Sequence, residues 1–343
     1  MAEMQTYIAW ANDSNILGSS ASGGIFQALA KYFLTGLSTD DVERTVYGSW
    51  QDNQRFEVKH LGVYKQEDVD LLIGSKYYQS RMEGIYPEIK KKLLNNQMIL
   101  FSGTPCQVAG LKSYLKGSGV KEISKLLTIE VLCHGVSSRK VILHYLEWLE
   151  KKSGKKIKDL HFRTKKRRWY DKGSSMEIYY NDGSMRIMNR YADPFYLAFN
   201  HSMSLRPSCY SCRFAKIDRI ADITIGDFWG AEKYIDDKQK LHNGIGLVMV
   251  NSDTGREFWE KAAGIITSFP ADIQKAIPRN GAIIKPVKKP TSRQIFFDSL
   301  DMCEFNELIV KCFGRKRLMK IRIKGAIGEE RIKQIKRTVF HRT

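Results

Sequence analysis

Apolar and polar positions follow two different periods along this chain, and together they predict an α/β fold. The runs MILFSG (98–103) and KLLTIEVLCHG (125–135) are short and apolar, as expected of buried strands. Each precedes a segment with helical spacing, QVAGLKSYLK (107–116) and SRKVILHYLEWLEKKSG (138–154). Strands that alternate with helices predict a parallel sheet covered by helices.

Other segments predict antiparallel pairs. RTVYGSW (44–50) and RFEVKHLGVY (55–64) predict two strands around a polar turn, and an NDG turn (181–183) predicts a hairpin. We therefore expect an α/β fold with α+β elements: a mixed sheet with covering helices, a small N-terminal subdomain and a basic helical C-terminal tail. The expected domains are residues 1–80, 81–300 and 301–343.

Composition narrows the class of protein. The chain has 343 residues, 43% of them hydrophobic, enough for one large or two ordinary globular domains. The first residues lack the basic segment and cleavage site of a secretory signal, and no apolar run approaches the ~20 residues that span a bilayer. We therefore expect a cytoplasmic protein whose six cysteines stay reduced.

The chain is strongly basic, with a formal charge of +19, which suggests an anionic partner. Residues 311–343 hold twelve Lys and Arg against two Glu, so +10 of this charge lies in the tail. There Leu318, Met319, Ile321 and Ile323 interleave with basic residues, a composition that suits an amphipathic helix on an anionic membrane surface. A solvated helix is the alternative, and no motif for specific nucleic-acid recognition is present.

Four cysteines stand at the ends of predicted elements. Cys106 follows the strand 98–103 and Cys133 ends the next strand, so neighbouring parallel strands would bring both thiols to the carboxyl edge of the sheet. Cys209 and Cys212 form a C-x-x-C turn, whose thiolates can bind one metal centre. Four thiols suit an iron–sulfur cluster or zinc, but Cys106 and Cys133 could equally be buried filler. Spacing alone leaves the three interpretations open.

A loop rich in Ser and Gly, SSASGG (19–24), precedes a segment with helical spacing. Free N–H groups at the start of a helix favour phosphate, so this loop could hold the phosphates of a nucleotide. The alternative is an ordinary helix start whose glycines permit close packing.

Six motifs occur in the order SSASGGIF, GSKYYQS, SGTPCQVAGLK, VLCHG, LRPSCYSCRFA and ADITIGDFWG. Over about residues 7–300 they resemble the coenzyme F420 hydrogenase/dehydrogenase beta-subunit family. The resemblance implies an iron–sulfur flavoprotein that passes electrons between a 4Fe-4S cluster, FAD and a two-electron acceptor. It implies that Cys106, Cys133, Cys209 and Cys212 hold the cluster. The residues expected to contact FAD are Ser20, Ser22, Gly23, Gly24, Gly74, Ser75, Lys76, Tyr77 and Thr104. Lys76 would neutralise the FAD pyrophosphate and Tyr77 would stack on a ring of FAD. An ordinary loop with an exposed lysine and a half-buried tyrosine is an equally good interpretation.

The chain also departs from the family pattern. Many bacterial relatives carry an N-terminal ferredoxin-like domain, which this sequence lacks, and six cysteines cannot build a second 4Fe-4S centre. We therefore expect an external electron donor such as a ferredoxin, and a chain that works as an oligomer or complex subunit. Short family members often accompany polysaccharide-biosynthesis enzymes, which suggests that role by association alone. Use of the deazaflavin coenzyme does not follow from the resemblance.

Several further residues are candidates without an assigned role. His134, next to Cys133, could transfer a proton near a redox centre, and Asp227 could contact a ligand; ordinary structural roles are at least as common. The cationic stretch RTKKRRW (163–169) could bind an acidic substrate or stay solvated. Cys303 and Cys312 lie in an apolar helical context and are expected in the core.

Overall fold

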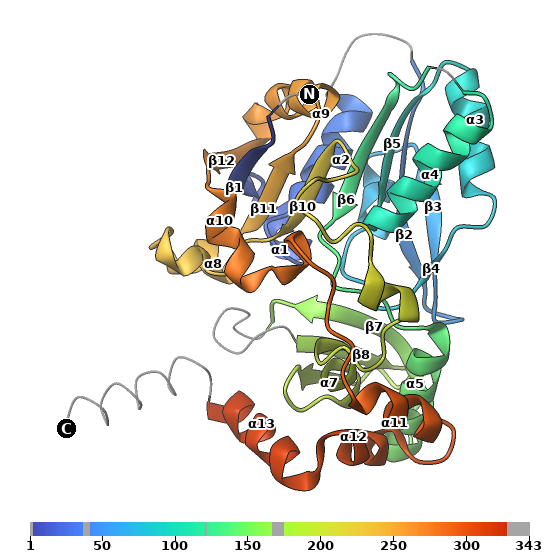
Figure 1. Ribbon diagram of the computed structural model, residues 1–343, viewed down its shortest axis with the longest axis vertical. Helices are drawn as coiled ribbons and strands as arrows, with labels where there is room; N and C mark the ends of the chain where they lie inside the picture. Colours follow the sequence, from blue (N-terminus) through green and yellow to red (C-terminus); the bar gives the residue numbers. More distant parts are fainter. Residues whose placement is uncertain (1–2, 37–41, 121, 167–174, 328–343) are drawn as a thin grey trace.

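Two lobes make up the molecule in the computed structural model, which describes residues 3–36, 42–120, 122–166 and 175–327. The larger, here called the sheet lobe, contains a long mixed sheet. The smaller, here called the small lobe, contains a short antiparallel sheet and lies below the sheet lobe in Figure 1.

The strands of the sheet lobe are β1 (Gln5–Ala11), β2 (Arg44–Asp52), β3 (Glu57–Val63), β4 (Ser80–Arg81), β5 (Met98–Gly103), β6 (Leu126–Val131), β10 (Ile223–Asp227), β11 (Gly246–Val250) and β12 (Ile266–Pro270). Those of the small lobe are β7 (Ile157–Thr164), β8 (Ser175–Tyr180) and β9 (Met185–Asn189).

The helices of the sheet lobe are α1 (Ser14–Ser19), α2 (Ile25–Thr35), α3 (Ile85–Leu94), α4 (Pro105–Gly117), α8 (Lys238–Asn243), α9 (Asp253–Lys261) and α10 (Ile273–Ala276). Those of the small lobe are α5 (Arg139–Ser153), α7 (Pro194–Asn200), α11 (Ser292–Ser299), α12 (Phe305–Phe313) and α13 (Arg315–Ile327). Short 3-10 turns are η1 (Glu67–Leu71), η2 (Pro207–Ser211), η3 (Ala231–Lys233), η4 (Ala263–Ile265), η5 (Ile277–Arg279) and η6 (Gly281–Ile283).

The large sheet has the strand order β12-β1-β11-β10-β6-β5-β2-β3-β4. Its four central strands, β10, β6, β5 and β2, run parallel to one another. Antiparallel strands flank them, with β11 on β10 and β3 on β2. The central strands therefore end together at one border of the sheet, here called the carboxyl edge.

Alternation along each central strand sends side chains to the two faces of the sheet. On β5, Leu100 belongs to the core under α2 and α9, whereas Ile99 and Phe101 belong to the core under α3 and α4. Helices thus cover both faces, as expected for parallel strands.

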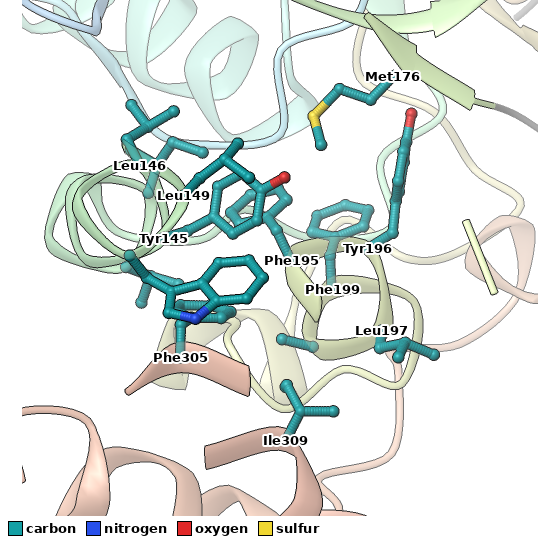
Figure 2. Close-up of a cluster of buried hydrophobic side chains, with 14 of the residues drawn as sticks. Tyr145, Leu146, Leu149, Met176, Phe195, Tyr196, Leu197, Phe199, Phe305 and Ile309 are labelled. Atoms are coloured by element: carbon teal, nitrogen blue, oxygen red, sulfur yellow. The ribbon is translucent and has the colours of Figure 1, made fainter. Parts of the chain in front are cut away.

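Aromatic and aliphatic side chains pack together in the core of the small lobe (Figure 2). Tyr145 of α5 lies 5.5 Å, centroid to centroid, from both Phe195 and Phe305. Its hydroxyl donates to the buried carboxylate of Asp193 at 2.6 Å, and the same carboxylate accepts from the Tyr196 N–H to cap α7. The Asp193 carboxylate is therefore satisfied within this core.

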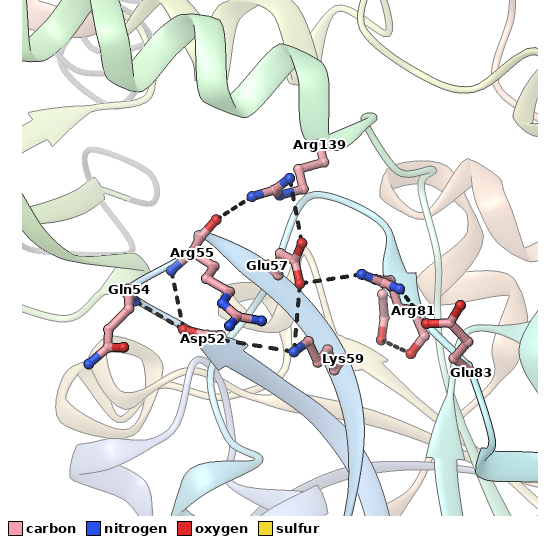
Figure 3. A network of polar contacts seen from close by, with 9 residues as sticks. Asp52, Gln54, Arg55, Glu57, Lys59, Arg81, Glu83 and Arg139 are labelled. Atoms are coloured by element: carbon pink, nitrogen blue, oxygen red, sulfur yellow. Dashed lines mark hydrogen bonds and ion pairs between the residues drawn. The ribbon is translucent and has the colours of Figure 1, made fainter.

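Polar contacts join the lobes at the start of α5 (Figure 3). Arg139 lies 3.5 Å from the Glu57 carboxylate on β3 and donates to the Arg55 carbonyl at 2.7 Å. Gln51 on β2 donates to the Leu160 carbonyl on β7 at 2.9 Å. These contacts hold β7 against the sheet lobe.

The structure confirms the mixed α/β architecture, the strands 44–50 and 55–64, and the hairpin, in which Gly183 has a φ of +81°. The segment 1–80 contributes β1, β2 and β3 to the same sheet as β5 and β6. An FAD-contacting subdomain with a boundary at residue 80 thus stays a prediction. In the segment 301–343, α12 supplies core residues of the small lobe, including Phe305 and Leu308.

The prediction that Leu318 and Ile321 of α13 enter a membrane surface is wrong. Leu318 is only 3% exposed and Ile321 packs against the small-lobe core, so neither can enter a membrane surface. Met319 and Ile323 are exposed, as that interpretation required. Leu318 and Ile321 are covered because α13 packs against α12. No helix in the described part of the chain is long and apolar enough to cross a bilayer.

Candidate functional site

The carboxyl edge brings the cysteine-bearing loops together. Strands β5 and β6 are neighbours in parallel register, with Gly103 opposite Glu130, so the loops that follow them leave the sheet side by side. This confirms the strand arrangement that the sequence predicted for Cys106 and Cys133.

Cys106 lies in the first turn of α4. Pro105 occupies the first helical position, and the Gln107 side-chain oxygen accepts from the Thr104 N–H at 2.9 Å, which fixes the start of the helix. The Thr104 hydroxyl lies 3.2 Å from the Cys106 sulfur. Cys106 is exposed at this helix start.

Cys133 begins a loop that runs beside the C-x-x-C segment. Arg206 donates its N–H to the Val136 carbonyl at 3.0 Å, and Ser137 forms a bridge with Leu205. Gly135 has a φ of +143°, and a Cβ there would lie 2.7 Å from Leu205. A glycine is therefore needed for the two segments to approach.

Cys209 and Cys212 lie on and directly after the 3-10 turn η2. The Cys209 N–H donates to the Arg206 carbonyl at 3.0 Å, and the Tyr210 hydroxyl donates to the Ser202 carbonyl at 2.5 Å. These bonds fix the C-x-x-C turn next to the loop of Cys133.

The pKa values of the thiols indicate that the four cysteines share one environment. Burial raises the pKa of Cys133 to about 12, and the negative charges of the Cys106, Cys209 and Cys212 thiolates add to the effect. Burial also raises the pKa of Cys209, again with contributions from Cys106 and Cys212. Thiolates that interact in this way repel one another, and a positively charged metal centre would relieve that repulsion.

Across the described ranges, no three or more His, Cys, Asp or Glu side chains converge on a single metal ion. One tetrahedral ion requires sulfurs about 3.8 Å apart, given Zn–S bonds of about 2.3 Å. A 4Fe-4S cluster spreads its four thiolates farther, because each binds a different iron.

A buried ion pair anchors the loop after the C-x-x-C turn. Arg219 and Glu130 contact each other with side-chain exposures of 1% and 0%. Arg219 also donates to the carbonyls of Phe214 and Lys216, each at 3.0 Å. The pair thus links β6, three residues before Cys133, to the segment that follows Cys212.

The predicted Ser/Gly loop lies at the same edge, after β1. A Cβ on Gly23 would lie 2.8 Å from the Ala9 carbonyl, and Gly24 has a φ of +76°. Close packing therefore requires both glycines, as the alternative interpretation expected. Ser20 donates to the Ser22 carbonyl at 2.6 Å. Phosphate binding by this loop stays a prediction.

Lys165 reaches this loop from the small lobe. Its ammonium group donates to the carbonyls of Leu17 and Ser22 and to the Ser20 hydroxyl, the last two at 2.9 and 3.3 Å. Among the described residues it forms no ion pair, and burial lowers its pKa to about 8. The first part of RTKKRRW is thus a contact between the lobes; residues 167–169 lie outside the described residues.

The second predicted flavin segment, Gly74–Tyr77, runs between the lobes. Ser75 forms a bridge with Phe162 on β7, and the Tyr77 ring stacks on Phe199 with centroids 4.3 Å apart. Gly74 has a φ of +82°, the left-handed region that favours glycine. One face of the Tyr77 ring thus stacks on Phe199 of the same chain. Stacking of Tyr77 on a flavin ring stays a prediction.

Lys76 is a second partly buried lysine. Its ammonium group donates to the carbonyls of Leu72 and Ile73 at 3.0 and 2.6 Å, and burial lowers its pKa to about 7. In the described chain it has no carboxylate partner. Lys76 and Lys165, both with lowered pKa values, thus lie where the two segments predicted to contact FAD approach β7.

The two candidate catalytic residues have different surroundings. Asp227, at the end of β10, accepts from Arg163 of β7 at 2.7 Å, and both charges act on the Tyr77 hydroxyl. His134 contacts the Ser202 hydroxyl at 3.2 Å and packs on Phe199. Asp227 therefore lies in the predicted flavin region, whereas His134 belongs to the cysteine loop.

Sequence reasoning missed several residues of the site. Arg163 and Lys165 lay in a stretch flagged only as cationic, while Glu130 and Arg219 lacked any motif. His60 was also missed: its ring is buried, contacts the Ser80 hydroxyl at 2.7 Å and the Ser102 carbonyl at 3.0 Å, and has its pKa lowered to about 4 by burial. Cys303 and Cys312 pack against the small-lobe core, as predicted.

The fold and the site define an α/β protein with four thiols at the carboxyl edge of a mixed sheet. A family model that describes the C terminus of the beta subunit of coenzyme F420 hydrogenase/dehydrogenase matches residues 96–272, and the chain belongs to this family. The matched segment contains all four cysteines. Membership assigns the chain to a family of oxidoreductase subunits.

A solved structure has the same fold. A chain from "Xenon derivatization of the F420-reducing [NiFe] hydrogenase complex from Methanosarcina barkeri" superposes with a TM-score of 0.55 at 18% sequence identity. The match covers 81% of this chain and 88% of that one. A comparison with curated proteins finds no match.

Proposed function

We propose that this chain is an iron–sulfur flavoprotein oxidoreductase. In this proposal Cys106, Cys133, Cys209 and Cys212 hold a 4Fe-4S cluster at the carboxyl edge. The observation that supports it is that three cysteine-bearing loops run side by side, and that neighbouring thiols contribute to the raised pKa values of Cys133 and Cys209. Thiolates are the preferred ligands of such clusters.

FAD would lie between the Ser/Gly loop, Gly74–Tyr77 and the end of β7. Lys76 and Lys165 support this placement, because a buried ammonium group held only by neutral oxygens is costly. An anionic pyrophosphate would stabilise both charges. When bound, FAD would exchange two electrons with an acceptor while the cluster passes them singly.

The chain's own residues would bind and orient these groups. Tyr77, held by Phe199, presents a rigid aromatic surface, and Arg163 orients the Asp227 carboxylate at 2.7 Å. Packing of the two lobes against each other would exclude water from the region between them. Asp227 is therefore proposed as a residue that positions a ligand in the FAD region, whereas His134 belongs to the cysteine loop.

The partners belong to the same proposal. A ferredoxin would be a suitable external electron donor for the single proposed cluster. The fold neighbour comes from a hydrogenase complex, which supports a role within a larger assembly. The acceptor would be a two-electron substrate, with a polysaccharide precursor as the class suggested by association.

Anaerobic purification and reconstitution test this proposal. The protein should take up about four iron and four sulfide, bind one FAD and absorb broadly near 400 nm. Ala at Cys106, Cys133, Cys209 or Cys212 should remove iron to a similar extent, whereas Cys303→Ala and Cys312→Ala serve as matched controls. Zinc at full occupancy would indicate a structural metal protein instead. Absence of both metal and flavin would indicate a redox-inactive binding or assembly protein.

We also propose that the chain works in the cytoplasm at an anionic membrane surface. Exposed Met319 and Ile323 and the basic residues of α13 support this placement. A reducing compartment would keep the four thiols available as ligands.

A further inference from the structure

Two adjoining pockets lie on the small lobe, away from the cysteine site. They have volumes of about 360 and 260 Å³, and Arg322 of α13 lines both. Figure 1 places α13 at the end of the small lobe that is farthest from the sheet lobe.

The first pocket combines an apolar floor with three cations. Trp148 and Met188 provide apolar surface, and Lys152, Arg186 and Arg322 supply positive charge. These residues come from α5, β9 and α13, so only the fold brings them together. None of the described residues that line this pocket is acidic.

The second pocket, along α13, also combines apolar and cationic side chains. Arg315 and Arg322 lie beside Leu318, Met319 and Ile323. It is also free of acidic side chains among its described lining residues. The two pockets thus form one apolar surface with a cationic centre at Arg322.

The cations of this surface are not neutralised within the described chain. Lys152 lies over the Trp148 ring at 5.0 Å, and Arg322 donates only to the Asn306 amide oxygen at 3.1 Å. None of Lys152, Arg186, Arg315 and Arg322 forms an ion pair with a described residue, and Arg186 acts on the buried Asp193 carboxylate only beyond ion-pair distance. Gathering like charges costs electrostatic energy, and an anion would offset that cost.

An exposed apolar stripe borders the pockets. Met319, Ile323 and Ile327 are 60%, 51% and 40% exposed and recur at every fourth position, so they lie on one side of α13. Lys316 and Lys320 are exposed in the adjacent row. Apolar residues flanked by cations suit the boundary between headgroups and acyl chains.

We propose that this surface binds an anionic phospholipid leaflet. A lipid phosphate would lie at Arg322, between Arg186 and Arg315, and the stripe of Met319 and Ile323 would enter the interface. The inference deepens the proposed membrane placement and is independent of the redox proposal. Docking at this end would leave the carboxyl edge, between the lobes, away from the bilayer.

Sedimentation with vesicles tests the site on the full-length protein as purified. Binding should occur to phosphatidylcholine vesicles with about 30% phosphatidylglycerol and not to phosphatidylcholine alone. Each cation removed should weaken partitioning about fivefold, so Arg186→Gln/Arg322→Gln should lose about 25-fold. Lys65→Gln/Lys91→Gln, which removes two exposed cations from the sheet lobe, is the matched control and should change binding much less. Met319→Gln/Ile323→Gln tests the stripe without altering charge.

Further measurements distinguish the alternatives. Dihexanoyl phosphatidylglycerol should compete at concentrations where inorganic phosphate does not; equal competition by phosphate would assign the site to free phosphate and overturn the proposal. Preference for duplex DNA over vesicles would also overturn it, as would equal binding by Arg186→Gln/Arg322→Gln and the control. Iron and flavin contents, measured in the same variants, should not change, which separates failure of this site from failure of the redox function.

Discussion

Arg219 and Glu130 form a fully buried ion pair that ties the strand before Cys133 to the loop after Cys212. The Arg219 guanidinium donates hydrogen bonds both to the Glu130 carboxylate and to the backbone carbonyls of Phe214 and Lys216. It therefore determines the relative position of two cysteine loops that are far apart in the sequence.

Removal of Arg219 alone should destabilise the protein strongly. Arg219→Met leaves the Glu130 carboxylate buried without its cation, which should cost about 3–5 kcal/mol of the free energy of unfolding. Arg219→Met/Glu130→Leu should recover most of this loss, because no unpaired charge remains. Urea unfolding measures both, with Lys216→Met in the same loop as an exposed control. Equal losses in the single and double variants would contradict this account.

The thiols should differ in reactivity in iron-free protein. Cys106 is exposed and should be alkylated first, whereas Cys133, with a pKa of about 12, should react slowest. The rate at Cys133 should rise about a hundredfold from pH 7 to 9, because the thiolate fraction grows tenfold per pH unit below the pKa. Iodoacetamide labelling with peptide mass spectrometry measures each site. After reconstitution all four should be protected, and Cys303 and Cys312 should be unaffected. Equal rates at Cys106 and Cys133 would refute the shared environment.

FAD binding should be accompanied by proton uptake. At pH 8 Lys76, with a pKa of about 7, is mostly neutral, and a bound pyrophosphate would raise its pKa and protonate it. Affinity for FAD should therefore fall as pH rises from 7 to 9. Lys165, with a pKa of about 8, is half neutral at this pH and should take up about half a proton more. Calorimetry in two buffers of different ionisation enthalpy should therefore detect about 1.4 protons at pH 8, of which about 0.9 come from Lys76.

The lysine variants locate that uptake. Lys76→Gln and Lys165→Gln should each weaken FAD binding about tenfold or more, since each removes a charge-assisted contact. Lys166→Gln, next in sequence but exposed, is the control. Undiminished uptake in Lys76→Gln would assign the proton to another group.

His60 should make the protein sensitive to acid. Its pKa is about 4 in the folded chain against about 6.5 when unfolded, so the unfolded state binds the proton first as pH falls. Stability from this residue is complete above about pH 6.5 and is lost progressively down to pH 4, by about 3 kcal/mol. His60→Gln should flatten the dependence of the unfolding free energy over that range. An unchanged slope would show that other groups dominate.

The sequence by itself determined the class of fold and the cysteine loops. The apolar run before Cys106 and the one before Cys133 are long enough to be strands and are each followed by a helix, and these local patterns depend only on neighbouring residues. The same holds for the turn at Gly183 and for the C-x-x-C spacing. Strand β1 was missed because its short apolar run becomes a strand only through pairing with β11 and β12.

Only the tertiary structure decided which side chains meet. Lys165 at the Ser/Gly loop, Arg163 at Asp227 and Arg219 at Glu130 are contacts between residues 64 to 145 positions apart, and no local pattern encodes them. Likewise the composition of α13 indicated an interfacial helix, but packing against α12 buried Leu318 and left Met319 and Ile323 outside. Periodicity is a property of neighbouring residues, whereas burial and pairing depend on how distant elements pack together.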